Sequence, residues 1–256
     1  MRRAPLALVL SLSLGLPATA LVGGAPEVPD PANQPEVMLV GVVGERSNFC
    51  TGTAIARDLV LTAAHCVLPG AVYKLLSFTA NKTPVLKDTT LVVHHPQFDL
   101  KTMLAHRATA DVALLKLAAP LNVQPATLLP PRQRVAPGER FVLRGYGFAV
   151  RGDGSSAGTL RYAALIATGQ PGNLQLRLVD PATGGTRAGF GACTGDSGAP
   201  VYVEATNKLA IYGLVSWSTG PGGDSGCGGL TGVTPLDLYR GWIEQQAKRM
   251  ESALSP

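Results

Sequence analysis

The sequence predicts an all-β protein made of two halves, followed by one helix at the C-terminal end. Glycine occurs 30 times and proline 20 times among 256 residues, which indicates many turns between short strands. Hydrophobic residues make up 46% of the chain and charged residues only 15%, so the composition excludes a disordered chain and supplies a sizeable core. Short apolar runs typical of strands lie on both sides of residues 120–137, which hold five prolines.

These patterns give approximate boundaries within the chain. Strand-like runs occupy residues 36–120 and residues 138–234, and the proline-rich residues 120–137 form a crossover between them. After Pro235, apolar residues recur at helical spacing, which predicts a helix over about 236–250. The apolar positions of that helix are Leu238, Trp242, Ile243 and Ala247.

Residues 1–20 are typical of a secretory signal sequence. Two arginines form a basic start, residues 4–16 are an apolar run, and Ala18-Thr19-Ala20 fits the small residues before a cleavage site. The alternative is a membrane anchor, but the apolar run is too short to span a bilayer comfortably. We therefore expect a mature chain of residues 21–256 that is secreted, extracellular or periplasmic, and not inserted in a membrane.

Charge argues against nucleic acid as a partner. The formal net charge is +5, and it falls to +3 when Arg2 and Arg3 leave with the signal sequence. That charge is small and evenly spread, so it indicates a solvated surface. The composition, rich in Ala, Leu, Pro and Arg, hints at a bacterial source.

The four cysteines point to disulfide bonds. An even number of cysteines in an exported protein suggests pairing, and four of them allow three connectivities. The sequence contains no C-x-x-C pair, which argues against a zinc cluster. The four are Cys50, Cys66, Cys193 and Cys227.

Three short segments carry residue types that suit nucleophilic catalysis. A serine hydroxyl is a poor nucleophile near neutral pH and needs a base within hydrogen-bond reach, and that base needs a partner that fixes its tautomer. Each segment alone also fits a structural role, but together, in the order His, Asp, Ser, they are much more specific. The segments are Leu61-Thr62-Ala63-Ala64-His65-Cys66, Asp111-Val112-Ala113-Leu114-Leu115-Lys116-Leu117 and Gly195-Asp196-Ser197-Gly198-Ala199-Pro200.

These segments resemble the signatures of the chymotrypsin–trypsin family, and the similarity runs from Leu21 to about Trp242. The resemblance implies two antiparallel six-stranded β-barrels packed together, with a short C-terminal α-helix. It also implies a serine endopeptidase in which His65 is the general base, Asp111 orients it and Ser197 attacks the peptide carbonyl. The oxyanion hole would be the backbone N–H groups of Gly195 and Ser197.

The resemblance extends to the disulfides and to the start of the mature chain. It implies the pairs Cys50–Cys66 and Cys193–Cys227. The segment Leu21-Val22-Gly23-Gly24 resembles the family's N-terminus, whose freed ammonium enters the interior and pairs with the Asp before the nucleophile, here Asp196. Because the expected signal cleavage exposes Leu21 directly, we expect no separate zymogen step.

Alignment to Ser197 also gives an expected substrate site. Its primary pocket would have Gly191 as the floor with Ala192 beside it, and Ser218 and Gly232 as walls. None of these residues is charged, so we expect preference for a mid-sized or large apolar residue, with an elastase-like preference for small residues as the alternative. Asp224 lies in the nearby loop, where we favour a solvated position. The remaining substrate-binding residues would be Thr194, Ser216 and Trp217.

No metal or cofactor is expected. The loop after Leu75 lacks the paired acidic residues of calcium-binding relatives, and His94, His95 and His106 are interpreted as surface-loop residues. The expected partners of this monomer are polypeptide substrates and protein protease inhibitors. The tripeptide Asn81-Lys82-Thr83 is a glycosylation sequon that matters only in a glycosylating host.

Two alternative functions compete with the protease. An α/β-hydrolase uses Gly-x-Ser-x-Gly and places the serine before the histidine, whereas here Ala199 breaks that motif and His65 comes first. An inactive relative that serves as a binding protein is the other alternative. Such proteins usually lose a member of the triad, and this chain keeps all three.

Overall fold

The computed structural model describes residues 21–43, 46–67, 72–78, 83–131, 134–172, 174–205 and 208–255. The expected signal sequence, residues 1–20, and the first two residues of the sequon, Asn81 and Lys82, lie outside the described residues. Among the helices that the structure describes, none has the length and apolar character needed to cross a membrane.

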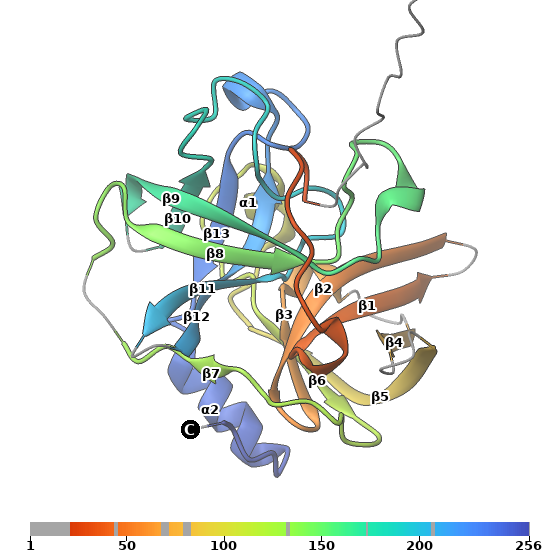
Figure 1. The fold of residues 1–256 in the computed structure, drawn as a ribbon. Coiled ribbons are helices and arrows are strands. Elements are labelled where there is room, and N and C mark those ends of the chain that lie inside the picture. The colour runs from red at the N-terminus through yellow and green to blue at the C-terminus, as the bar shows by residue number, and fades with distance from the viewer. Residues whose placement is uncertain are drawn as a thin grey trace, which may run out of the picture.

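The first half of the chain closes into an antiparallel barrel (Figure 1). Its strands pair in the order β1-β2-β3-β6-β5-β4, and β1 pairs with β4 to complete the ring. The interior is filled by buried apolar side chains such as Leu39, Leu75 and Leu115. The strands are β1 (Glu36–Val43), β2 (Arg46–Ala56), β3 (Leu59–Thr62), β4 (Val72–Phe78), β5 (Pro84–His94) and β6 (Ala113–Leu117).

The second half forms a second barrel. Its strands run in the order β11-β8-β9-β10-β13-β12, and an additional pairing of β11 with β12 closes the ring. The prediction of two six-stranded barrels is therefore confirmed. The unexpected β7 (Thr127–Leu128) adds a parallel strand beside β12. The six barrel strands are β8 (Arg140–Gly145), β9 (Arg161–Gly172), β10 (Gln175–Val179), β11 (Pro200–Ala205), β12 (Lys208–Ser218) and β13 (Thr231–Pro235).

The C-terminal helix α2 (Arg240–Arg249) begins four residues later than the expected position 236. The reason is a turn in which the Tyr239 N–H donates to the Leu236 carbonyl oxygen at 2.9 Å, so these residues are not yet helical. Both side chains are nevertheless buried. Helical spacing therefore placed the start of the helix one turn too early. It also included Leu238 in the apolar face, although that side chain is 56% exposed, whereas Ile243 is buried as expected.

A second helix and four short 3₁₀ segments were not expected. Helix α1 (Leu100–Leu104) is held at its start by Asp99, whose carboxylate accepts the Thr102 N–H at 2.6 Å. Its five residues are too few to produce a helical pattern in sequence. The 3₁₀ segments are η1 (Pro31–Asn33), η2 (Ala64–Cys66), η3 (Gly154–Ser156) and η4 (Pro221–Gly223).

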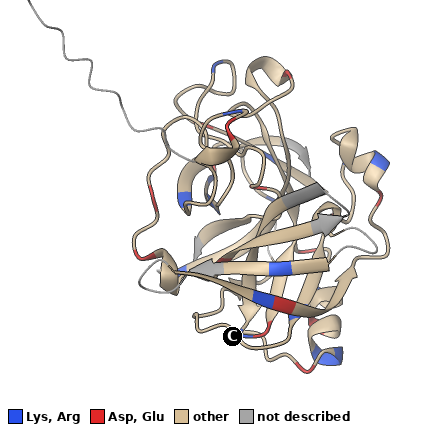
Figure 2. Ribbon diagram, turned by 90° about the vertical axis from the view of Figure 1, so that its right-hand side faces the viewer, with Lys and Arg blue, Asp and Glu red and all other residues tan. Residues whose placement is uncertain are grey.

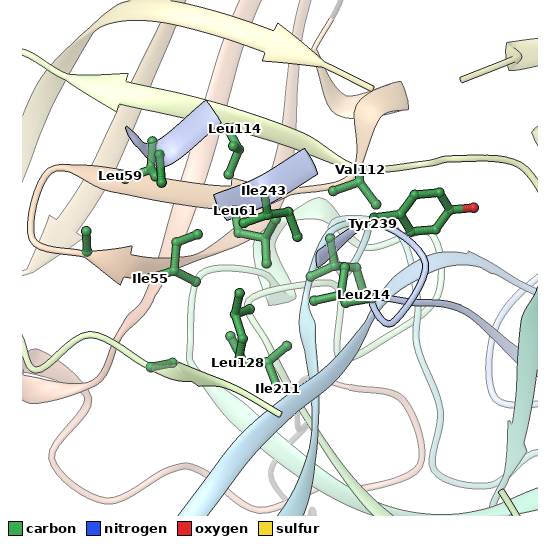
Figure 3. Packing of buried hydrophobic residues seen from close by; sticks show 14 of the residues in the cluster. Ile55, Leu59, Leu61, Val112, Leu114, Leu128, Ile211, Leu214, Tyr239 and Ile243 are labelled. Carbon is green, nitrogen blue, oxygen red and sulfur yellow. The ribbon is translucent and has the colours of Figure 1, made fainter. Parts of the chain in front are cut away.

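One apolar cluster joins both barrels and the C-terminal helix (Figure 3). Leu61 and Leu114 come from the first barrel, Ile211 and Leu214 from the second, and Ile243 from α2. Each such side chain contributes about 1.5–3 kcal/mol when fully buried. The cluster stabilises one arrangement of the two barrels, so residues from both can meet at a single site.

Charged residues do not gather on one part of the fold. Figure 2 shows Lys and Arg interspersed with Asp and Glu along the ribbon. The ion pair of Lys74 Nζ with Asp88 Oδ1, at 2.6 Å, is exposed at both side chains. Such surface pairs contribute little, so the fold depends on its apolar clusters.

Candidate active site

His65 and Asp111 meet because their strands are neighbours in the first barrel. His65 lies in η2, directly after β3, and Asp111 lies directly before β6. These two strands pair antiparallel, with Thr62 opposite Ala113. The end of β3 and the start of β6 therefore lie at the same edge of the barrel.

The Asp111 carboxylate accepts three hydrogen bonds while fully buried. Its Oδ1 accepts the His65 backbone N–H at 2.9 Å, and its Oδ2 lies 2.8 Å from His65 Nδ1. The Ser216 hydroxyl donates to the same Oδ2 at 2.5 Å. A buried carboxylate that accepts from Nδ1–H fixes the tautomer of the imidazole and leaves Nε2 free to take up a proton.

Ser197 is brought to this edge from the second barrel. Its carbonyl oxygen accepts the N–H of Thr51 in β2 at 2.9 Å, which attaches the serine loop to the first barrel. The next residue, Gly198, donates its N–H to the Val215 oxygen at 2.8 Å, one residue before Ser216. Within the part of the chain that the structure describes, the Ser197 hydroxyl has no hydrogen bond, so it is not committed to a structural contact.

The turn that carries Ser197 requires glycine on both sides. Gly195 and Gly198 have φ angles of +92° and +77°, in the left-handed region that side chains disfavour. A Cβ on Gly195 would overlap the Phe49 ring, and one on Gly198 would overlap Thr62 Oγ1. Neither the Gly195 N–H nor the Ser197 N–H is taken by a hydrogen bond among the described residues, so both remain able to stabilise an oxyanion.

Asp196, between these residues, is a second fully buried carboxylate. Its oxygens accept the backbone N–H groups of Gly147 and Cys193, each at 2.9 Å. Burial raises the pKa of Asp196 to about 7. Across the described residues no cationic side chain forms an ion pair with it. Among the described side chains this carboxylate therefore lacks the positive partner that a buried charge requires.

The expected start of the mature chain lies close to this loop. Leu21 is fully buried, in an apolar cluster that also contains Ala192 and Ala199. The following residue, Val22, forms an isolated antiparallel bridge with Gly191. The structure thus brings Leu21 into the same barrel interior as the residues around Asp196.

Two disulfides brace the site. Cys50 of β2 is joined to Cys66, directly after His65, and Cys193 is joined to Cys227 in the loop before β13. Each closure contributes about 3–4 kcal/mol in the chain-entropy model. They constrain the segments beside the histidine and before the serine.

The structure changes the expected walls of the primary pocket. Gly232 does not open onto it, because the Trp217 indole lies across that face of Gly232 and would overlap any Cβ there. Side chains alternate along a strand, so the neighbouring Thr231 points to the opposite face. There its Oγ1 accepts the Ala192 N–H at 3.1 Å, and a Cβ on Gly191 would lie 3.5 Å from it.

Sequence reasoning missed Thr231 for lack of register information. Which residue of β13 faces the pocket floor is shown by the register with β12, in which Gly232 pairs with Trp217 and Thr231 pairs with Ser218. Ser218 lies beside it, with its hydroxyl donating to the Gly226 oxygen at 3.2 Å. Asp224 is exposed, as expected, and Thr194 is an exposed residue whose carbonyl oxygen accepts the Phe148 N–H at 2.8 Å.

Of the three other histidines, His95 is not a surface residue. It is 8% exposed, and its ring packs edge-on against Tyr239 and Trp242 with centroid distances of 5.1 and 5.0 Å. Burial lowers its pKa. His106 is exposed and stacks on Trp217 with a centroid distance of 4.5 Å. His94 packs edge-on against Phe98.

One group of potential metal ligands occurs among the described residues, and its chemistry does not suit an ion. Cys50, His65 and Cys66 have ligand atoms within 4.8 Å of one another. Both sulfurs belong to the disulfide, so neither is available as a thiolate. His65 Nδ1 is also engaged by Asp111.

The barrels and the site together define a chymotrypsin-like serine protease architecture. The profile of the trypsin family matches residues 27–243, and the chain belongs to that family. The chain is also similar to a vitellin-degrading protease of Bombyx mori, with 27% identity over 224 residues that cover 80% of this chain and 79% of the relative.

We predict that Gly198→Ala destabilises the protein far more than Gly138→Ala. Both glycines have left-handed φ angles, +77° and +79°, which cost alanine about 1–2 kcal/mol. A Cβ at Gly198 also overlaps neighbouring atoms, whereas one at Gly138 meets nothing within 4 Å. We expect about 3 kcal/mol or more of loss for Gly198→Ala, measured by urea unfolding. Equal losses for the two variants would contradict this account of the turn.

Proposed function

We propose that this chain is a secreted serine endopeptidase, formed by residues 21–256, that hydrolyses peptide bonds through an acyl-enzyme. The observation that carries the proposal is the buried Asp111 carboxylate, which orients His65 through both its backbone N–H and its ring Nδ1. The main-chain bonds of Ser197 and Gly198 to Thr51 and Val215 support a serine placed beside that imidazole.

In the proposed mechanism Ser197 Oγ attacks the substrate carbonyl while His65 Nε2 takes its proton. The N–H groups of Gly195 and Ser197 stabilise the oxyanion, because they point their dipoles to where negative charge develops. His65 then gives the proton to the leaving amine, whose C–N bond breaks, and an acyl-Ser197 ester remains. Water activated by His65 hydrolyses the ester and restores the serine.

The same site makes an inactive binding protein the weaker candidate. A relative that only binds has no need of a buried carboxylate that orients an imidazole, since burying a charge is costly. This chain keeps that carboxylate together with the glycines beside the nucleophile. Polypeptide substrates follow from the family, and protein inhibitors that occupy the same site are proposed as further partners of a monomeric enzyme.

Export is part of the proposal. Residues 1–20 have the pattern of a signal sequence, and disulfides persist in oxidising compartments. An extracellular or periplasmic location suits both features. A bacterial source is proposed on composition alone, whereas the relative named above is an insect protein.

We also propose that the ammonium of Leu21, freed by signal cleavage, pairs with Asp196 without a further activation step. Leu21 is fully buried near residues that flank the Asp196 turn. Asp196 has no cationic partner among the described side chains. An ammonium there would compensate the buried carboxylate and hold the Gly195–Ser197 segment in one conformation.

For specificity we propose an uncharged primary pocket that favours apolar residues. Its floor, at Gly191 and Ala192, carries no charged side chain. The position of Thr231 favours a preference for small substrate residues over large ones. Its side chain faces the pocket floor and fills space that a glycine there would leave open for the substrate.

The hydrolytic function is tested by covalent labelling of Ser197. A sulfonyl fluoride or an organophosphonate should label the chain that begins at Leu21 at this residue, because His65 activates its hydroxyl. Ser197→Ala should abolish labelling, and His65→Ala should lower kcat/KM on denatured protein by about 10⁴-fold or more. A folded sample that is neither labelled nor active would favour the binding protein.

The Leu21–Asp196 pair predicts a difference in pH dependence between a free and a blocked N-terminus. A blocked chain leaves Asp196 with a pKa of about 7, raised from 3.8, so its folded state binds the proton more tightly than its unfolded state. Its stability should therefore fall as pH rises from about 4 to 7. A chain with free Leu21 should lose that slope, measured by urea unfolding.

The control for this comparison is Asp196→Asn, which should remove the dependence of stability on pH from the blocked chain as well. Identical pH slopes for the free and blocked chains would argue against the pair. Intact mass of the secreted, fully active protein gives its first residue, and any residue other than Leu21 would rule out activation by signal cleavage alone.

The role of Thr231 is tested by Thr231→Gly. Removing the side chain should open the floor, so cleavage should shift from small residues toward large apolar ones, by about tenfold or more in relative kcat/KM. Thr234→Gly, a substitution three positions further along the same strand, serves as the control for loss of strand stability. A cleavage profile that is dominated by Lys or Arg would overturn the uncharged pocket itself.

A further inference from the structure

The segment Ser216–Ser218 presents an open strand edge beside the candidate triad. On one side β12 pairs with β13 as far as Ser218, opposite Thr231. On the other side its pairing ends where the Val215 N–H donates to the Ala199 oxygen at 2.9 Å. An extended peptide can add to that free edge as a further strand, with its side chains alternating between two faces.

The two faces of this edge differ in chemistry. Thr231 lies on the face of the Gly191–Ala192 floor, and Trp217 lies on the opposite face, across Gly232. If the residue before the scissile bond enters the floor, then the third residue before the bond shares its face. The second and fourth residues before the bond must then face the Trp217 side.

On that side Arg177 stands next to the indole. Arg177 of β10 pairs with Gly232 of β13, which in turn pairs with Trp217 of β12, so the three residues form one cross-strand row. Because Gly232 has no side chain, the indole lies across it, and the Arg177 guanidinium carbon is 5.7 Å from the ring centroid. The positive charge is thus held at the indole by stacking.

This charge has no anionic partner among the described residues. No ion pair joins Arg177 to a carboxylate there, and both its Nε and the Trp217 Nε1 are buried without a hydrogen-bond acceptor. Asp180 of the same region is engaged elsewhere, with its two oxygens accepting the Ala182 and Phe190 N–H groups at 2.8 and 2.9 Å. Arg177 remains partly exposed, so a ligand can reach it.

We propose that Arg177 is a specificity-determining residue that binds an acidic side chain of the substrate, at the second or fourth residue before the scissile bond. This inference rests on the proposed peptidase function and adds a substrate class to it, namely peptides with a carboxylate upstream of the cleaved bond. A carboxylate is the acceptor that a guanidinium binds most strongly, through charge-assisted hydrogen bonds. The neutral indole beside it strengthens the attraction by limiting contact with water.

The test uses quenched fluorescent peptides of one sequence that differ at a single position. Glu, Gln or Lys is placed at the second, third or fourth residue before the scissile bond, and kcat/KM is measured with the mature enzyme at low salt. We expect kcat/KM of the Glu peptide to exceed that of the Gln peptide by about fivefold or more at the second or the fourth position. The ratio should be smaller in about 0.5 M NaCl. At the third position, on the other face, the ratio should stay near one.

Variants identify the residue responsible. Arg177→Gln should remove the preference for Glu, and Arg177→Glu should reverse it toward Lys. Arg140→Gln makes the same charge change on β8, away from the Trp217 row, and should leave the preference for Glu unchanged. His106→Ala, which removes the ring stacked on Trp217, should also keep it because the charge belongs to Arg177.

Three results would overturn the inference. One is a Glu-to-Gln ratio of kcat/KM near one at both the second and the fourth position, in an enzyme that cleaves the Gln peptides well. That result would leave the peptidase function intact. Another is a preference for Glu that survives Arg177→Glu. The last is a folded chain that cleaves no peptide and is not labelled at Ser197, which would remove the peptidase function and this inference with it.

Discussion

The buried Asp111 carboxylate is the interaction on which the rest of the site depends. It accepts from the backbone and ring of His65 in the first barrel and from the Ser216 hydroxyl in the second. A carboxylate withdrawn from water is tolerated only when such donors surround it. The same three bonds therefore satisfy a buried charge, orient an imidazole and connect the two barrels at the point where the chemistry is proposed to occur.

The barrels serve this interaction by bringing distant segments to one edge. Register places the residues after β3 and before β6 side by side, and the shared apolar cluster with α2 sets the second barrel against the first. The serine loop then bridges the barrels through its bond to Thr51. Its glycines are required because atoms of the first barrel, the Phe49 ring at Gly195 and Thr62 Oγ1 at Gly198, approach where a side chain would otherwise stand.

Few charged groups lie around the site, and three of them differ in how their charge is compensated. Asp111 is fully hydrogen-bonded, Asp196 has only backbone donors, and Arg177 has an aromatic neighbour but no anion among the described residues. Incomplete pairing of this kind is unfavourable in the isolated fold. A terminal ammonium at Asp196, or a substrate carboxylate at Arg177, would supply the missing partner, which favours its binding.

The sequence was sufficient to predict the residue types that suit the chemistry, because short segments around His65, Asp111 and Ser197 carry them without reference to the fold. It also determined the all-β class, through its turns and apolar runs. Two features could be read only from the folded chain: Thr231, and not Gly232, faces the pocket floor, and α2 begins at Arg240. For Thr231 this is because side-chain direction in a strand reverses with each residue, so only the pairing register between distant strands assigns a residue to one face of the sheet.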